Sequence, residues 1–225
     1  MKIKEKLQLD YNGLAQHGPI NIVILGDSVS QGALRVSFDY EMVYWNLLRK
    51  KLNAVRDGVP VNMICSAIAG TTASEGVPRL QAQVLDHHPD LVIVCFGLND
   101  INQPLDIYLE SLKTIFDECR AADTDIIFMT PNMLNTRVAD DTQEQYWEYA
   151  HQTADMQNSG KMDEYIYAAI AQAKEMNITV CDCYSKWKEL AKNEDVTLLL
   201  VNRINHPIPE MHQLFADSLF ELIME

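Results

Sequence analysis

Short runs of apolar residues alternate along the chain with longer amphipathic stretches. Five such runs cover residues 20–26, 61–65, 91–97, 126–130 and 178–183. Each run is continuous rather than alternating, which is typical of strands buried on both faces of a sheet. Helical patterns lie between and after them, at about 39–56, 75–87, 104–121, 159–176, 184–193 and 209–224. This order predicts an α/β protein in which helices cover both faces of a doubly wound, five-stranded parallel sheet.

One connection is longer than the others. About thirty residues, at about 131–160, separate the fourth predicted strand from the next helix, and loops of this length are usually functional or mobile. The middle of this insertion is compatible with a helix, on which Tyr146, Trp147 and Tyr149 would form an aromatic face. We predict that Tyr146 and Trp147 bind substrate, although packing of the insertion onto the protein would explain them equally well. We expect a single domain over residues 1–225 that includes this insertion.

Polar residues with catalytic potential follow the predicted strands. The first strand ends in Gly-Asp-Ser, which includes Ser28, and the loop after the second strand contains Gly70. The third strand ends in Gly-Leu-Asn-Asp, which includes Asn99, and His206-Pro207 stands just before the last helix. Ligands of open parallel sheets bind beyond the carboxyl ends of the strands, so we expect these segments to meet at one edge.

The order of these motifs resembles the SGNH hydrolases, also called GDSL-type esterases and lipases. The resemblance extends from about residue 20 to residue 224 and implies a flavodoxin-like, three-layer α/β/α fold. Each motif alone is common by chance, whereas all four in this order form a specific signal. The resemblance implies Ser28 as nucleophile, His206 as general base, and Ser28, Gly70 and Asn99 as the donors of the oxyanion hole.

These roles are also chemically coherent. Ester hydrolysis needs a nucleophile, a base that takes its proton, and N–H donors that face the developing oxyanion. Ser28 can supply both a hydroxyl and a backbone N–H, Gly70 an N–H with no side chain in the way, and Asn99 a side-chain amide. We place Asp27 in the substrate-binding region, where it would bond loop backbone beside the site.

The sequence departs from the family pattern at one position. The family usually carries an aspartate three residues before the histidine, where this chain has Arg203. If the loop contains one extra residue, Asn202 replaces the acid and orients the imidazole of His206. A backbone carbonyl that orients a Ser–His dyad is the alternative. An arginine that pointed at the imidazole would lower its basicity.

Composition narrows the function classes. The net charge of −14 argues against nucleic acid and anionic membrane surfaces as partners. The five cysteines have neither zinc-site nor redox-motif spacing, the first residues lack the apolar segment of a secretory signal, and no apolar run is long enough to span a membrane. We therefore expect a reduced, cytoplasmic protein that uses no metal or organic cofactor; the oligomeric state is left open.

The expected function is hydrolysis of a small or short-acyl ester, such as an O-acetyl group on a carbohydrate or a similar polar alcohol, through an acyl-enzyme on Ser28. Two alternatives remain open. The fold could serve as a non-catalytic binding module, or the same site could transfer an acyl group to an alcohol instead of water. Labelling of Ser28 by a fluorophosphonate tests the first alternative, and product analysis with an added acceptor alcohol tests the second.

Overall fold

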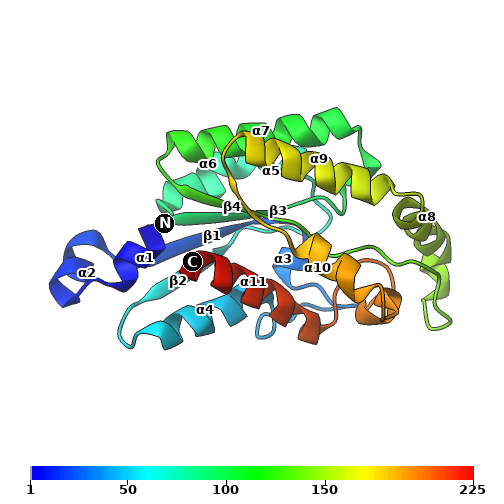
Figure 1. Ribbon diagram of the computed structural model, residues 1–225, viewed down its shortest axis with the longest axis horizontal. Helices are drawn as coiled ribbons and strands as arrows, with labels where there is room; N and C mark the ends of the chain where they lie inside the picture. The colour runs from blue at the N-terminus through cyan, green and yellow to red at the C-terminus, as the bar shows by residue number, and fades with distance from the viewer. Residues whose placement is uncertain (1) are drawn as a thin grey trace.

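The computed structural model describes residues 2–225, which contain one five-stranded sheet. Its strands are β1 (Ile20–Gly26), β2 (Val61–Cys65), β3 (Leu91–Cys95), β4 (Asp125–Met129) and β5 (Thr179–Cys181). All neighbouring strands are parallel, and their order across the sheet is β2-β1-β3-β4-β5 (Figure 1). This is the flavodoxin-like order, so the predicted fold class is confirmed.

The sheet contains a switch point beside β1. The chain leaves β1 for β2 on one side and later returns to form β3 on the other side, so the carboxyl ends of β1 and β3 bound a crevice. Gly26 at the end of β1 pairs with Cys95 at the end of β3. All residues of β3, and all of β1 except Asn21, are buried, which explains why their sequences read as continuous apolar runs.

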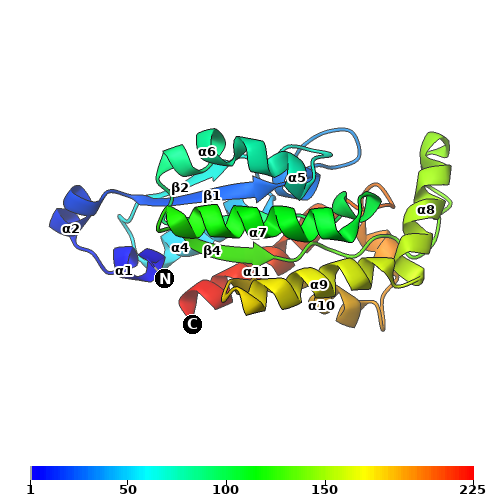
Figure 2. The ribbon, with the colours of Figure 1, turned by 90° about the horizontal axis from the view of Figure 1, so that it is seen from above.

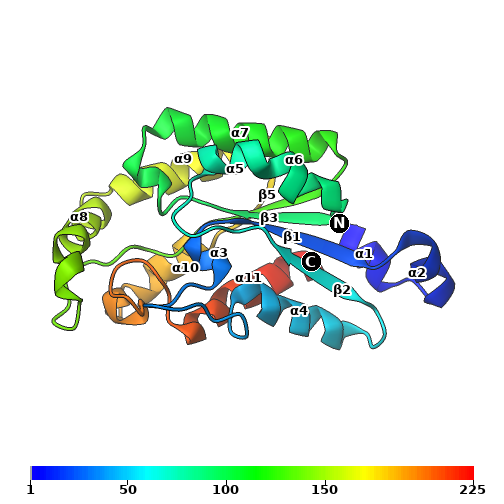
Figure 3. The ribbon, with the colours of Figure 1, turned by 180° about the vertical axis from the view of Figure 1, so that it is seen from behind.

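Two helical layers enclose the sheet (Figures 1 and 3). One layer holds α4 (Tyr44–Val55), α10 (Cys183–Leu190) and α11 (His212–Met224). The other layer holds α5 (Ala73–Gly76), α6 (Leu80–Gln83), α7 (Leu105–Ala121) and α9 (Lys161–Glu175), and α7 runs along β4 when seen from above (Figure 2). Aromatic side chains pack these layers together. Phe116 of α7 meets Phe128 of β4 edge to face, and Tyr44 of α4 meets Phe215 of α11 in the same way.

Some helices differ from the sequence prediction. The helix predicted at 75–87 is divided into α5, a 3-10 turn, α6 and a second 3-10 turn, because Pro78 offers no N–H to a continuous helical ladder. Two N-terminal helices, α1 (Lys2–Leu7) and α2 (Tyr11–His17), were not predicted. They are too short to show a clear period, yet Ile3 and Leu7 are buried in the core.

The insertion lies at the end of the molecule toward which the strands point (Figures 1 and 2). Residues 131–143 are irregular, and α8 (Trp147–Asn158) follows a short 3-10 turn. Asn135 links the irregular part to α8, since its side-chain amide donates to the carbonyl of Ala150 and accepts from the hydroxyl of Thr153. The insertion therefore contains the helix that its middle part predicted, and this helix begins at Trp147.

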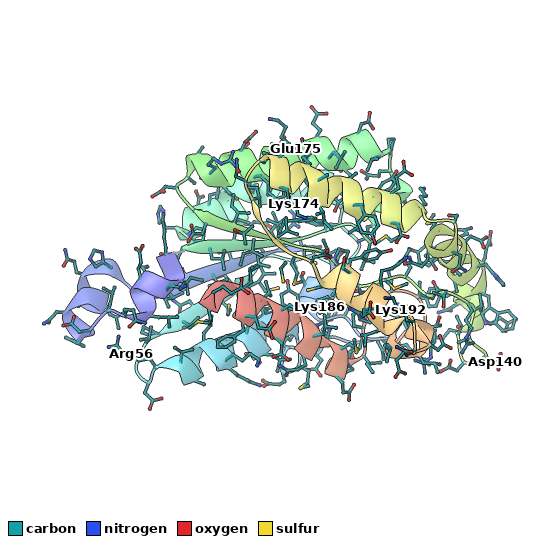
Figure 4. All side chains as sticks on the ribbon, in the orientation of Figure 1. Arg56, Asp140, Lys174, Glu175, Lys186 and Lys192 are labelled. Atoms are coloured by element: carbon teal, nitrogen blue, oxygen red, sulfur yellow. The ribbon has the colours of Figure 1, made fainter. Side chains whose placement is uncertain are left out.

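Charged side chains occupy the outside of the helical layers. Lys174, Glu175 and Lys192 are exposed and lie on outer surfaces in Figure 4. Within residues 2–225, no helix combines the length and the apolar character needed to cross a membrane.

Candidate active site

Ser28 begins the short helix α3 (Ser28–Gln31) directly after β1, and we call residues 26–32 the nucleophile turn. Gly26 allows the backbone to pack tightly at this point. A Cβ at Gly26 would lie 2.5 Å from the Ser30 hydroxyl and 2.7 Å from a backbone oxygen of β3. Ser28 itself is 5% exposed and lines a cavity beyond the end of β1. The turn therefore holds the hydroxyl at the switch point of the sheet.

Asp27 does not line this cavity, so its prediction as a substrate-binding residue is wrong. Its side chain is fully buried, and one carboxylate oxygen caps α3 by accepting from the N–H of Val29 at 3.0 Å. The other oxygen has no hydrogen-bond partner within residues 2–225. Burial raises the pKa of Asp27 to about 7. The Asp27 side chain therefore lies in the protein interior, where its carboxylate stabilises the start of α3.

His206 lies against Ser28. Its Nε2 is 3.0 Å from the Ser28 hydroxyl, and its Nδ1 is 2.8 Å from the backbone carbonyl oxygen of Leu34. A carbonyl oxygen only accepts, so Nδ1 carries the hydrogen and Nε2 is free to accept the serine proton. Burial lowers the pKa of His206, partly offset by the hydrogen bond to Leu34. The imidazole is thus held neutral and in the tautomer of a general base.

Asn202 is not the partner of the imidazole, which corrects the predicted orienting role. We call residues 200–208 the histidine loop. The Asn202 side-chain oxygen accepts from three successive backbone N–H groups, those of Ile204, Asn205 and His206, at 2.9–3.1 Å. Asn202 therefore shapes the loop that carries His206 and leaves the ring to a backbone carbonyl, the alternative considered above. It also lines the cavity.

Arg203 points away from His206. Its Nε donates to both carboxylate oxygens of Asp141 in the insertion, at 2.9 and 3.0 Å, and its Nη1 donates to the carbonyls of Leu198 and Leu200. The backbone of Arg203 is left-handed, with a φ of 61°. This conformation turns the side chain outward, so a cation at the usual aspartate position does not act on the imidazole.

Gly70 and Asn99 lie in the same cavity as Ser28 and His206. Gly70 has a φ of +79°, which favours glycine, and its N–H has no acceptor within residues 2–225. One N–H of the Asn99 amide donates to the carbonyl of Thr71 at 2.9 Å, which leaves the second N–H available. Asp100 ties the two loops together by accepting from the N–H groups of Ala73 and Gly97, and burial raises its pKa to about 6.

The cavity has a volume of about 300 Å³, and part of its wall comes from the insertion. Tyr146 lines it, whereas Trp147 does not. The indole N–H of Trp147 donates to the carbonyl of Thr142, and the ring is 46% exposed, so its predicted substrate contact is wrong. Adjacent residues at the start of a helix face different directions, and Tyr149 rather than Trp147 shares the side of Tyr146.

A comparison with protein families decides the identity of this arrangement. The GDSL-like Lipase/Acylhydrolase family matches residues 24–214, which include the nucleophile turn, the Gly70 and Asn99 loops and the histidine loop. The chain belongs to this family. The predicted family is thereby confirmed, and membership makes this GDSL-type protein a carboxylic-ester hydrolase. A search among curated proteins gave no match.

Solved structures similar to this GDSL-type hydrolase share its fold. An acetylxylan esterase from Geobacillus stearothermophilus aligns with a TM-score of 0.71 and 21% identity, over 91% of this chain and 94% of the other. A lipase/acylhydrolase from Enterococcus faecalis aligns with a TM-score of 0.69 and 22% identity, over 91% and 95%. Catalytic mutants of the acetylxylan esterase replace a serine, an aspartate and a histidine, and that aspartate precedes the histidine by three positions.

Three features of the GDSL-type site were missed in the sequence. Leu34 acts through its backbone, so its side chain gives no signal. Gln143 lies in the irregular part of the insertion, where no periodicity indicates direction. Arg35 also lines the cavity, and a basic residue so close to the nucleophile in an acidic chain could have been noticed.

Proposed function

We propose that this esterase hydrolyses short-acyl esters, such as an O-acetyl group on a carbohydrate or a similar polar alcohol, through an acyl-enzyme on Ser28. The observation that carries the proposal is the 3.0 Å contact between the Ser28 hydroxyl and His206 Nε2, within a cavity that Gly70 and Asn99 also line. Nucleophile, base and amide donors therefore surround one small space, as acyl transfer requires.

Acylation begins when the Ser28 oxygen attacks the ester carbonyl and its proton passes to His206 Nε2. The backbone N–H groups of Ser28 and Gly70 and the free N–H of the Asn99 amide stabilise the oxyanion of the tetrahedral intermediate. His206 then donates its Nε2 proton to the leaving alcohol oxygen as the carbon–oxygen bond breaks. The acyl group remains on Ser28 as an ester.

Deacylation repeats these steps with water. His206 takes a proton from the water, whose oxygen attacks the acyl carbonyl, and then returns that proton to Ser28 as the free carboxylic acid leaves. The Leu34 carbonyl holds the ring in one orientation throughout and carries partial negative charge toward the imidazolium. A carbonyl dipole stabilises that cation less than a carboxylate does, so the structure supports a Ser–His dyad.

The size and polarity of the cavity support a small substrate. A volume of about 300 Å³ lies at the lower end of the range for small-molecule sites. Its walls contain amides, hydroxyls and aromatic rings, which suit a polar alcohol better than a long acyl chain. The acetylxylan esterase that shares the fold is named for such an ester, and this likeness favours O-acetyl groups as the first substrates to test.

Substitution of the nucleophile tests the proposal. We expect Ser28→Ala to lower kcat on a chromogenic acetate ester by about 10⁴-fold or more, and to abolish fluorophosphonate labelling. Ser30→Ala is the matched control, because the Ser30 hydroxyl bonds Tyr44 and lies outside the cavity. Labelling that persists in Ser28→Ala would refute the assignment of the nucleophile. An assay with added acceptor alcohol would show any acyl transfer as ester product in place of free acid.

A further inference from the structure

We propose that Arg35 recognises a carboxylate on the alcohol part of the substrate, so that the preferred substrates are short-acyl esters of alcohols that carry a carboxylate group. This inference rests on the proposed esterase function and adds a substrate class to it. Among the cavity-lining residues within residues 2–225, Arg35 is the one with a permanent charge. In the part of the chain that the structure describes, the lining contains no aspartate or glutamate, although the whole chain has a net charge of −14.

The guanidinium of Arg35 is only partly engaged by the protein. Its Nε donates to the carbonyl of Val201 at 3.2 Å, and its Nη2 lies 3.6 Å from a carboxylate oxygen of Asp141. The side chain is 36% exposed. Arginine presents five N–H donors in a planar fork that matches a carboxylate in two-point contact, so several donors of Arg35 remain available.

Asp141 does not cancel the charge of Arg35. The same carboxylate receives the Nε of Arg203 at 2.9 and 3.0 Å, a closer contact than the one with Arg35. The hydrogen bond from Arg203 lowers the pKa of Asp141, which keeps the carboxylate ionised. Two arginines and one aspartate leave one positive charge, and the arginine with free donors is the one that lines the cavity.

Other acidic groups of the insertion lie elsewhere. Asp140, Glu144, Glu148 and Asp155 are exposed and do not line the cavity, and Asp140 projects at the outer end of the molecule in Figure 4. An acidic surface repels anionic substrates over about one Debye length, whereas a cation inside the site selects them at short range. The positive charge of Arg35 therefore favours binding of anionic esters in the cavity over neutral ones.

The carboxylate is assigned to the alcohol part because the proposed substrates are short-acyl esters, whose acyl group carries no further substituent. Ser28, Gly70 and Asn99 line the cavity of about 300 Å³ in which such an ester would react. Arg35 lines the same cavity as these residues, so one small molecule can contact both Arg35 and Ser28.

The test compares two acetate esters that differ in one charge, meta-acetoxybenzoate and meta-acetoxybenzamide. We expect the wild-type enzyme to prefer the benzoate in kcat/KM by about 10-fold or more at low salt, mainly through KM, and the preference to shrink as salt is added. Arg35→Gln should abolish the preference, Arg35→Lys should keep part of it, and Arg35→Glu should reverse it. Arg137→Gln is the matched control, because Arg137 pairs with Asp195 outside the cavity.

The ratio between the two esters separates recognition from general damage. Leu34 orients His206, so a disturbed backbone beside it would slow both esters equally and leave the ratio unchanged. The inference would be overturned if the ratio of kcat/KM for the benzoate to kcat/KM for the benzamide were the same in the wild-type enzyme and in Arg35→Gln. Titration of meta-acetoxybenzoate into Ser28→Ala, with and without Arg35→Gln, gives a readout that needs no turnover. If the wild-type protein showed no esterase activity while benzoate binding still depended on Arg35, recognition of the carboxylate would stand and only the proposed function would be rejected.

Discussion

The nucleophile turn and the histidine loop bring Ser28 and His206 together by different means. The nucleophile turn is fixed by backbone packing at the end of a buried strand: Gly26 fits against the Cys95 carbonyl of β3, and Asp27 caps the helix that Ser28 begins. The histidine loop is held by hydrogen bonds, both from within the loop, where Asn202 accepts from three backbone N–H groups, and from partners far away in the chain. Asn132 of the insertion donates to the carbonyl of Asn205, and the carbonyl of Leu34 receives the His206 ring.

This difference separates a rigid half of the site from an adjustable half. The nucleophile turn continues a buried strand, so it can move only if the sheet moves. The histidine loop is shaped by hydrogen bonds from polar side chains, each of which contributes a modest free energy and can change independently of the core. Substitutions in the turn should therefore affect stability and activity together, while substitutions in the loop should affect activity more than stability.

Gly26→Ala should give the largest effect. The added Cβ would overlap the Ser30 hydroxyl and the Cys95 carbonyl, and the carbonyl cannot move without distorting β3. We expect a loss of about 3 kcal/mol in the free energy of unfolding, together with loss of esterase activity. Urea denaturation and an acetate-ester assay measure both. The control is Gly58→Ala, where a Cβ would meet nothing within 4 Å, so this variant carries only the strain of a left-handed alanine, about 1 kcal/mol, without any overlap. A stable but inactive Gly26→Ala protein would show that the turn and the sheet are less tightly coupled than the packing indicates.

Asn202→Ala should mainly affect activity. The substitution removes the acceptor for three backbone N–H groups and frees the loop that carries His206. We expect kcat to fall by about 10²-fold, because a displacement of about 1 Å in a catalytic group can cost that much. The free energy of unfolding should fall by only about 1 kcal/mol, since the loop is partly exposed.

Arg203→Ala is the matched control for Asn202→Ala at the adjacent position. Its side chain binds Asp141 and two carbonyls away from the imidazole, so a smaller loss of activity is expected. If Arg203→Ala were the more damaging variant, the tie to the insertion would position His206 more than the Asn202 turn does.

The two halves of the site also differed in how far the sequence could predict them. Strand positions followed from continuous apolar runs, and the Gly-Asp-Ser motif located the nucleophile turn because local residues build it. The partner of the His206 ring could not be identified, because any residue can supply a carbonyl. Asn202 was named for the wrong contact, since its effect on three N–H groups depends on a left-handed Arg203 that no pattern reveals. Trp147 was misplaced because residues 146 and 149 share one face of a helix, whereas residue 147 lies about 100° further round the axis and away from the cavity.

Asp27→Asn should change the pH dependence of stability. The raised pKa of Asp27, about 7 against 3.8, means that the folded state binds more protons than the unfolded state between these values. Its contribution to stability is therefore present at low pH and lost as pH rises toward 7. Asn keeps the capping oxygen without the charge, so the decline between pH 5 and 8 should become shallower by about 1 kcal/mol or more. Urea denaturation across this range measures the slope, with exposed Asp57→Asn as control. An unchanged slope would mean that Asp27 is solvated in the turn.

The pH profile of catalysis should show the smallest effect and tests the protonation state of His206. Burial lowers the pKa of His206 below its usual 6.5, so the neutral base persists to lower pH and kcat/KM should begin to fall only below pH 6.5. Burial also raises the pKa of Asp27 to about 7 and that of Asp100 to about 6, so the profile should be recorded in Asp27→Asn and in Asp100→Asn as well, and the acid limb must remain in both. NMR of labelled histidines identifies the group, because the signal lost in His206→Asn should titrate with that limb. His212 provides an internal reference, since burial lowers its pKa further, to about 4. A pKa of His206 at or above 6.5 would indicate that a carboxylate, rather than the Leu34 carbonyl, reaches Nδ1 during turnover.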